Sequence, residues 1–480
     1  MTSITSSGFN LDVDGIITKL MTVEKVPLTA LQTKATAIDS KISAYGTVKS
    51  QLSRLSDASA ALSKASLWQS KMVTSSQPAM VGVSVLDASA ASATSFSVEV
   101  QQLARAQSVS SAAVVAGAGF KGGTLSLQLG SWNTPDGGVA AFTADGTAAV
   151  SVSVQEGDSL ATIAAKINTA GAGVTATVLK DLSGERLLLR SSATGEAAGF
   201  RVQVQSDGSG SGQDLSQLAF DDATPGLGMA ANAVQYGRNA QATINGVAVT
   251  SASNTLGDTV PGLSLTLSQL TSAPVEVGVS SDTAALTKAV QGFVDAYNSM
   301  NQMLNAATDY DATTKTAALL QGDSVTVGLQ NALRSLAGGA VGDGALSHLS
   351  DLGISIKKGG AGDLEVDSAK LAKALQNPAA VQQFFAGSPE AGGVDGMAKR
   401  FADFTSRAIG ADGTLATRTA SLQTQKNDNT RQQDQVNDRL TLTEARLRKQ
   451  YSALDANLSS LTALDTYVSQ QIAQWNKSKD

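Results

Sequence analysis

The sequence predicts a multidomain α+β protein in which terminal coiled-coil helices and a helical body surround inserted β-rich head domains. Near both ends, apolar residues recur in alternating steps of three and four, as in the seam of a coiled coil. Between these ends lies a long stretch in which apolar and polar residues often alternate, as in strands with one buried face. The chain therefore leaves a helical stalk, builds a head and returns to the stalk.

Residues 1–70 are predicted to form the N-terminal helical leg. A short helix should begin near Asp12, whose carboxylate can cap free N–H groups. Its apolar face carries Ile16, Ile17 and Leu20. Pro27 lacks a backbone donor, so this helix should end or kink near Val26. A longer helix then reaches about Lys64.

The two terminal seams supply the candidate assembly residues. In the N-terminal seam these are Leu28, Leu31, Ile38, Ile42, Tyr45 and Leu52. In the C-terminal seam they are Leu447, Tyr451, Leu454, Leu458, Leu461, Val468, Ile472 and Trp475. Lys49 and Asp465 interrupt the seams, and such polar positions set register or oligomeric state. The seams can pair within one chain, between subunits, or both, and these alternatives stay open.

Strands are predicted from residue 71 to about residue 279. Residues 71–104 are assigned to the strand part of an inner body, and residues 105–282 to a β-rich head of two subdomains. One helix interrupts the strands at residues 160–167, with Asp158 as its expected N-cap. An Asn-Gly pair at 245–246 lies between apolar residues, which indicates a tight hairpin turn.

The helical period returns after Asp282. Residues 283–413 are predicted to form a helical inner body, and residues 414–480 the C-terminal coiled-coil helix of the leg. Within the body, helices are expected at 325–336, 368–375, 378–385 and 395–409. A chain of 480 residues is too long for one core, so two to four domains are expected.

Composition argues against an enzyme. The chain contains no Cys, which excludes disulfides, thiolate nucleophiles and Cys-ligated metals. Its one His, His348, is expected to be structural, at a helix end or in a turn. Because His is the commonest general base and metal ligand, few catalytic designs remain.

Charge and hydropathy also limit the partners. Between Arg105 and Asp282 there are eight Lys/Arg and fourteen Asp/Glu, and 8 − 14 = −6 equals the formal net charge of the whole chain. We therefore expect no nucleic-acid partner and no binding to anionic membranes. No apolar run is long enough to span a bilayer, so no membrane insertion is expected. Residues 1–6 do not resemble a secretory signal peptide, which leaves export by another route open.

Three short motifs resemble functional sites but lack residues or elements that the chemistry of those sites requires. Residues 117–122 (GAGFKG) have dinucleotide-loop spacing, but a strand pattern follows instead of the helix that would receive the pyrophosphate. Residues 309–313 begin like an EF-hand loop, but Thr314 and Leu320 replace the required Gly and Glu. Asp221 and Asp222 are expected to point in different directions, as sequence neighbours do, and no basic or His partner is expected nearby. No cofactor, metal or catalytic residue is predicted.

Several segments, in order along the chain, resemble the flagellar hook-associated protein 2 family, the filament cap proteins. In the N-terminal part these are GFNLDVDGII (8–17), 20–21, 24–28 and 41–46. In the middle they are 160–168, 245–246, 254, GLSLTL (262–267) and FVDAYN (293–298). Towards the end they are 322–323, 352–354, 364–371 and 450–454. Residues 106–154 are the least similar part.

The resemblance implies an extracellular, non-enzymatic cap at the distal tip of the bacterial flagellum. Subunits would form a homo-oligomeric ring, often of five, with the heads as a plate and the paired terminal helices as legs. Flagellin leaving the channel would be retained, folded and inserted beneath the plate. The implied partners also include hook–filament junction proteins, the flagellar type III export apparatus and an export chaperone at the C-terminal helix.

Two other functions are considered beside the cap. Another flagellar axial protein, such as a junction protein or a flagellin, would also have helical ends around a variable head. An extracellular adhesin is favoured only by the acidic β-rich head. Self-assembly separates the first from a cap, because flagellin grows long filaments whereas a cap stops at small rings.

Overall fold

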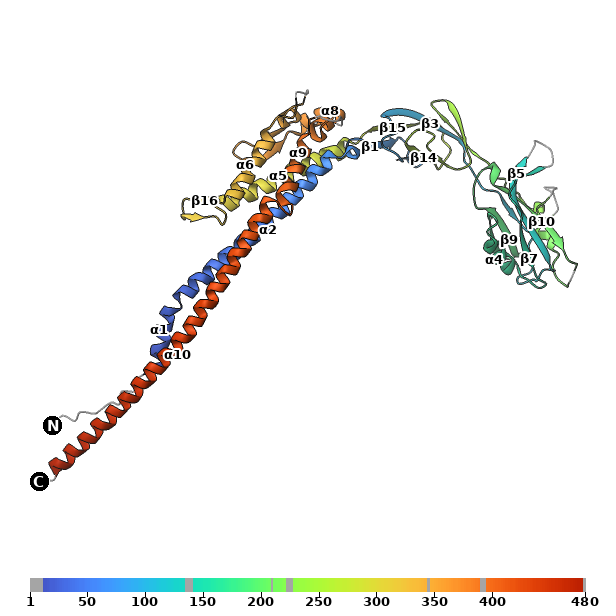
Figure 1. Ribbon diagram of the computed structural model, residues 1–480. Helices are drawn as coiled ribbons and strands as arrows, with labels where there is room; N and C mark the ends of the chain where they lie inside the picture. The colour runs from blue at the N-terminus through green and yellow to red at the C-terminus, as the bar shows by residue number, and fades with distance from the viewer. Residues whose placement is uncertain are drawn as a thin grey trace. The chain divides into compact units, whose positions relative to one another are not determined.

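The computed structural model describes residues 12–133, 141–208, 210–221, 228–342, 346–388 and 394–477 (Figure 1). It divides into two compact units. One consists of Met1–Trp68 together with Thr283–Asp480, and the other is Gln69–Asp282. We call them the helical unit and the head unit.

The helical unit begins with three helices, α1 (Val13–Glu24), α2 (Val26–Ser63) and α3 (Ala65–Trp68). The Asp12 carboxylate caps α1 by accepting the N–H of Gly15 at 2.9 Å, as predicted. The break before Pro27 is confirmed, since only Lys25 separates α1 from α2. The predicted apolar face of α1 needs one correction. Ile17 and Met21 are its buried residues, whereas Leu20 is 39% exposed.

The rest of this unit follows the head in sequence. Its helices are α5 (Thr283–Thr308), α6 (Ser324–Gly338), α7 (Ser368–Ala374), α8 (Pro378–Ala386), α9 (Met397–Ile409) and α10 (Thr414–Lys477). Two small hairpins lie between helices, β16–β17 (Tyr310–Asp311, Thr316–Ala317) and β18–β19 (Ile354–Ile356, Leu364–Val366). His348 immediately precedes the short 3₁₀ helix η4 (Leu349–Leu352), where its N–H donates to Asp351 at 2.9 Å.

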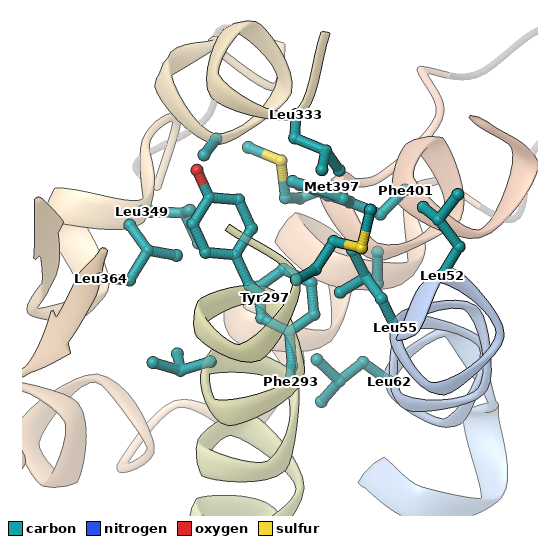
Figure 2. Packing of buried hydrophobic residues seen from close by; sticks show 14 of the residues in the cluster. Leu52, Leu55, Leu62, Phe293, Tyr297, Leu333, Leu349, Leu364, Met397 and Phe401 are labelled. Carbon is teal, nitrogen blue, oxygen red and sulfur yellow. The ribbon is translucent and has the colours of Figure 1, made fainter. Parts of the chain in front are cut away.

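Aromatic rings of α5 form the centre of the helical core (Figure 2). Phe293 and Tyr297 lie between α2, which contributes Leu52 and its neighbours, and Leu349 and Leu364 on the other side. Phe401 of α9 meets Phe293 edge to face with ring centroids 5.2 Å apart. All of these side chains are at most 4% exposed. Burial of large side chains at this density is the main stabilising term for such a bundle.

The head unit contains two hydrophobic clusters, each with its own sheets. The first subdomain has a five-stranded antiparallel sheet of order β1-β15-β3-β11-β12 and a three-stranded sheet of order β13-β14-β2. Their bounds are β1 (Lys71–Ser75), β2 (Val81–Val85), β3 (Thr94–Gln102), β11 (Ala240–Ile244), β12 (Val247–Ser251), β13 (Thr255–Gly257), β14 (Leu263–Leu267) and β15 (Val275–Ser281). The predicted hairpin at Asn245-Gly246 is confirmed, with both residues at positive φ between β11 and β12.

The second subdomain is inserted between β3 and β11. In one sheet β5 (Gly123–Asn133) pairs with β10 (Gly199–Ser206), β6 (Ala141–Ala144) and β7 (Val150–Val154). The other has the order β4-β9-β8, with bounds β4 (Ser108–Ser110), β8 (Val174–Asp181) and β9 (Gly184–Ser191). Helix α4 (Leu160–Ala170) buries Leu160, Ile163, Ala164 and Ile167 in the same cluster.

One predicted helix cap is wrong. The N-cap of α4 is Ser159, whose hydroxyl accepts the N–H of Thr162 at 3.3 Å. Asp158 instead accepts the N–H of Gln155 at 2.8 Å and pairs with Lys166. Its carboxylate therefore closes the preceding turn, which leaves the adjacent hydroxyl to cap the helix.

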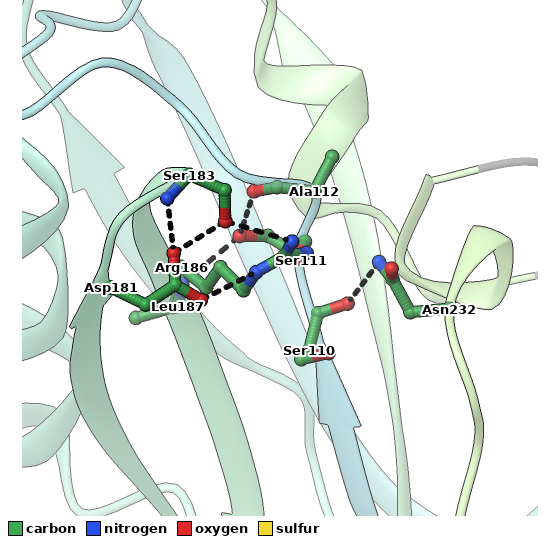
Figure 3. Close-up of polar contacts among 8 residues, drawn as sticks. All are labelled: Ser110, Ser111, Ala112, Asp181, Ser183, Arg186, Leu187 and Asn232. Atoms are coloured by element: carbon green, nitrogen blue, oxygen red, sulfur yellow. Dashed lines mark hydrogen bonds and ion pairs between the residues drawn. The ribbon is translucent and has the colours of Figure 1, made fainter.

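Polar contacts hold β4 against β9 (Figure 3). The Ser111 hydroxyl donates to the carbonyl of Ala112 at 2.8 Å and accepts the N–H of Leu187 at 2.9 Å. Asn232 donates its amide to the carbonyl of Ser110 at 3.0 Å. The edge strand β4 is thus fixed from both sides, although it is only three residues long.

Candidate assembly site

The described start of the chain packs against its C-terminal helix. Helix α1 and the start of α2 lie along α10 in the helical unit (Figure 1). Ile17 and Met21 are buried against Leu440, and the cluster extends over partly buried residues of all three helices. These are Val13, Leu28, Val436, Leu447 and Tyr451. The structure thereby brings Leu28 of the N-terminal seam together with Leu447 and Tyr451 of the C-terminal seam.

Polar contacts fix the alignment of these helices. Arg448 Nη1 lies 2.8 Å from Asp14 Oδ1, and Lys426 Nζ lies 2.7 Å from Asp39 Oδ1. Such exposed ion pairs contribute little energy. Asn429 is different, because it is 1% exposed and donates to the carbonyl of Leu31 at 3.1 Å. A buried amide in an apolar seam favours one register over others.

A buried polar junction joins three elements near the start of α10. The carboxylate of Asp323 caps α6 by accepting the N–H groups of Val325 and Thr326 at 3.1 and 3.2 Å. It also accepts a hydrogen bond from the Tyr45 hydroxyl of α2. Arg418 of α10 donates to its other oxygen through Nη2 at 2.7 Å and Nε at 3.1 Å. One carboxylate therefore connects α2, α6 and α10.

The protonation states at this junction follow from its geometry. Burial alone would raise the pKa of Asp323, but hydrogen bonds from Tyr45, Thr326 and Arg418 together lower it below its usual value. Burial, followed by the hydrogen bond to Asp323, raises the pKa of Tyr45. At neutral pH the carboxylate is therefore ionised while the phenol keeps its proton and donates it.

The rest of the N-terminal seam faces the helical core. Ile38, Tyr45 and Leu52 are buried, and Ile42 packs against them. Their cluster includes apolar residues of α5 and α9 as well as Leu415 and Leu422 from the start of α10. Leu31 is half-buried. Lys49 does not interrupt this face, since its side chain is exposed and Val48 takes the buried position.

The rest of the C-terminal seam is largely exposed. Beyond Tyr451, Leu458 is half-buried. The other predicted seam residues have exposed fractions from 45% to 74%: Leu454, Leu461, Val468, Ile472 and Trp475. Leu464 and Tyr467, which the prediction did not include, are each 58% exposed. The end of α10 thus presents an apolar surface in the single chain.

Some residues of this site were not found from the sequence. Met21 and Leu440 could have been found from helical spacing, since Met21 lies four residues after Ile17 and Leu440 seven before Leu447. Asp323 and Arg418 carry no such signal. Their partners are distant in sequence, with 278 residues separating Tyr45 from Asp323.

Together these features define a structural assembly protein. Helix α1 and the start of α2 are aligned with α10, and an apolar surface continues along α10. No group of His, Asp and Glu side chains in the described ranges is arranged to hold a metal ion. Among the helices that the structure describes, none is long and apolar enough to cross a membrane.

Comparisons with known proteins identify the family. Residues 9–107 match the model for the flagellar hook-associated protein 2 N-terminus, and residues 237–463 match the model for its C-terminus. Residues 141–193 match the flagellin hook IN motif. The chain is 31% identical to the B-type flagellar hook-associated protein 2 of Pseudomonas aeruginosa, over 96% of each chain. It is 29% identical to the Escherichia coli flagellar hook-associated protein 2, over the full length of both.

The fold agrees with this relationship. A crystal structure of the D1-D2-D3 domains of the flagellar cap protein FliD from Escherichia coli superposes with a TM-score of 0.59 at 26% identity. The match covers 79% of this chain and 99% of that one. The chain belongs to the flagellar hook-associated protein 2 family, the FliD filament cap proteins. It is accordingly a structural, non-enzymatic protein of the flagellar cap, at the extracellular tip of the flagellum.

Proposed function

We propose that copies of this chain form a homo-oligomeric ring, a pentamer, at the filament tip, where they retain exported flagellin and promote its folding and insertion. Residues 1–70 and 414–480 are the leg of each subunit in this proposal. Residues 283–413 form the inner body, and the head unit contributes to the plate; residues 71–104, predicted to belong to the inner body, are counted with the head unit because they share its sheets. The exposed seam residues between Leu454 and Trp475 contact other subunits in this proposal, whereas the N-terminal seam holds the leg to the helical core.

The exposed apolar surface of α10 is the observation that carries this proposal. Leu454, Leu461, Val468 and Ile472 are 45–60% exposed in the single chain. Apolar stripes of this kind mark surfaces that bind a partner. In a cap, that partner is a neighbouring leg or flagellin at the filament end.

Other partners follow from the same surface and from family membership. Before export, a chaperone would cover the exposed end of α10 and so prevent early association. The flagellar type III apparatus would then deliver the chain. Hook–filament junction proteins would provide the first site on which the ring assembles, before flagellin is added.

Deletion of the gene tests the proposal. The deletion strain should release abundant unpolymerised flagellin into the medium and carry short or absent filaments, and the wild-type gene should restore them. Filaments of normal length in the deletion strain would contradict the ring's role in flagellin retention. A loss of surface attachment with normal filaments would favour an adhesin instead.

A further inference from the structure

Two arginines face each other where the chain passes between the two subdomains of the head unit. The chain enters the inserted subdomain after β3 and returns from it before β11. These two segments pair as antiparallel backbone. Arg105 donates its N–H to the carbonyl of Arg238 at 3.0 Å, and Arg238 donates to that of Arg105 at 3.1 Å. Residues paired in this way project their side chains from the same face of the ribbon.

Among the described residues, no carboxylate forms an ion pair with either of these two guanidinium groups. Arg105 is exposed, and its Nε donates only to the carbonyl of Tyr236 at 3.2 Å. Nε of Arg238 is buried without a hydrogen-bond partner. Neither guanidinium forms an ion pair within the described residues of the chain. By contrast, five other cations of the head unit do: Lys121, Lys166, Lys180, Arg186 and Arg201.

The pair is unfavourable in the isolated chain. Like charges directly opposite each other destabilise a strand pair. Desolvation and the neighbouring charge of Arg238 both lower the pKa of Arg105. Glu196 lies nearby in the fold, because its N–H donates to the side chain of Asn239 at 3.0 Å, yet its carboxylate makes no described ion pair. The described residues thus place two guanidinium groups at this site, and none of the described carboxylates forms an ion pair with either of them.

We propose that Arg105 and Arg238 form a carboxylate-binding site that receives an acidic side chain from the head of a second copy of this chain. The inference rests on the proposed ring. Two guanidinium groups offer the donor geometry that a carboxylate accepts. A site on one copy and a carboxylate on the next make a heterologous contact, which is the kind that closes a ring.

Charge complementarity favours a second copy as the source of the carboxylate. The head unit, residues 69–282, contains nine Lys/Arg and sixteen Asp/Glu, and 9 − 16 = −7. Each head therefore carries more carboxylates than its own cations can pair. Glu276, for example, is exposed and forms no ion pair with any residue that the structure describes.

Substitution of both arginines tests the site. The variant R105Q/R238Q is compared with wild type and with K71Q/R190Q, which removes two charges from head-unit residues that form no ion pair in the described chain. Self-association of the full chain is measured by sedimentation velocity over a range of protein and salt concentrations. R105Q/R238Q should raise the dissociation constant at least about tenfold and weaken its salt dependence, whereas K71Q/R190Q should assemble like wild type. The melting temperature of R105Q/R238Q should be unchanged or higher, since a like-charge pair is removed.

The outcomes separate the two proposals. A wild-type chain that stays monomeric throughout overturns the ring and, with it, this contact. A wild-type chain that assembles no better than R105Q/R238Q overturns the arginine site alone and leaves the ring standing.

A second variant identifies the carboxylate without relying on stability. In R105K, a water-soluble carbodiimide would convert a contacting carboxylate into an O-acylisourea. The new amine at position 105 would attack its acyl carbon, which forms the amide and releases the carbodiimide as a urea. Mixing ¹⁵N-labelled with unlabelled chains shows by mass spectrometry whether the amide joins two copies. Cross-links to a head carboxylate of another copy support the proposal. Cross-links only within one chain, or none, overturn it.

Discussion

At the scale of single residues, Asp323 connects more elements of the helical unit than any other side chain described above. Its carboxylate accepts backbone N–H groups at the start of α6, the Tyr45 hydroxyl and two N–H groups of Arg418. The side chain is only 7% exposed, so its charge is compensated by these donors and not by water. Hydrogen bonds to a charged group are the stronger kind, and an unmade one is costly in a buried site.

We expect Asp323→Asn to lower the free energy of unfolding of the helical unit by about 2 kcal/mol. Asn caps a helix as well as Asp does, so the loss comes from the bonds to Arg418 and Tyr45. The control is Asp367→Asn, since Asp367 caps α7 through two N–H groups and forms no described ion pair. Denaturant unfolding of both variants should show a change of less than about 0.5 kcal/mol for the control. Equal effects would contradict the role of the junction.

The same residue predicts a pH dependence. The folded-state pKa of Asp323 lies below the reference value of 3.8 that serves for the unfolded chain. Its stabilising effect is therefore complete above that value and is lost as the pH falls through the folded-state pKa. The difference in unfolding free energy between wild type and Asp323→Asn should be constant from about pH 5 to 7 and shrink below about pH 4. A difference that grows on acidification would contradict this assignment.

Such a junction could not be predicted from the sequence. Arg418 lies 95 residues from Asp323, and neither residue belongs to a periodic pattern that would mark it. The assignment of a cap to Asp158 failed for a related reason. Asp158 and Ser159 are both good caps, and the competing bond to Lys166 decides between them.

At the scale of elements, helical and strand periods predicted most of the secondary structure, because burial of one face is a local signal. The helical period predicted which residues form the apolar faces of α2 and α10. It did not predict which other helix packs on each part of these faces. Tyr45 and Leu52 share the helical spacing of Leu28, yet they are buried in the core with α5 and α9. The partner of a seam is a tertiary property, and spacing alone does not contain it.

The exposed end of α10 allows assembly to be separated from folding. Replacing Leu454 and Leu461 with Asp should abolish capping, because charges in a packed seam are costly. Both residues are at least 45% exposed in the single chain, so the melting temperature should stay within about 2 °C of wild type. Motility and flagellin in the medium measure capping, and thermal unfolding measures the fold.

The matched control for that experiment is Ser452→Asp with Ser459→Asp. These two serines have the same seven-residue separation, are exposed, and precede each leucine by two positions, about 200° around the helix. They add the same charge to another face of α10, so capping should persist. Normal motility in the leucine variant would contradict the assignment of this seam. So would a loss of motility in the serine variant as large as that in the leucine variant.

At the scale of the whole molecule, the chain has two compact units with separate cores, and the head unit is inserted into the helical unit between Trp68 and Thr283. Family membership and the superposition with the Escherichia coli cap protein confirm the predicted α+β fold class. The sequence revealed this organisation because helical and strand periods occupy separate stretches. The charge pattern revealed an acidic head but not the opposed arginines, whose pairing depends on the return of the chain.

Separate cores predict separate unfolding. Phe200 is completely buried in the cluster of the inserted subdomain, and Phe200→Ala should cost that core about 3–5 kcal/mol. Asp323→Asn acts on the helical core instead. In differential scanning calorimetry of the full chain, we expect Phe200→Ala and Asp323→Asn each to lower a different transition. If either substitution shifted all transitions together, the two units would unfold as one cooperative body, and a loss of capping could no longer be assigned to the leg or the head from stability alone.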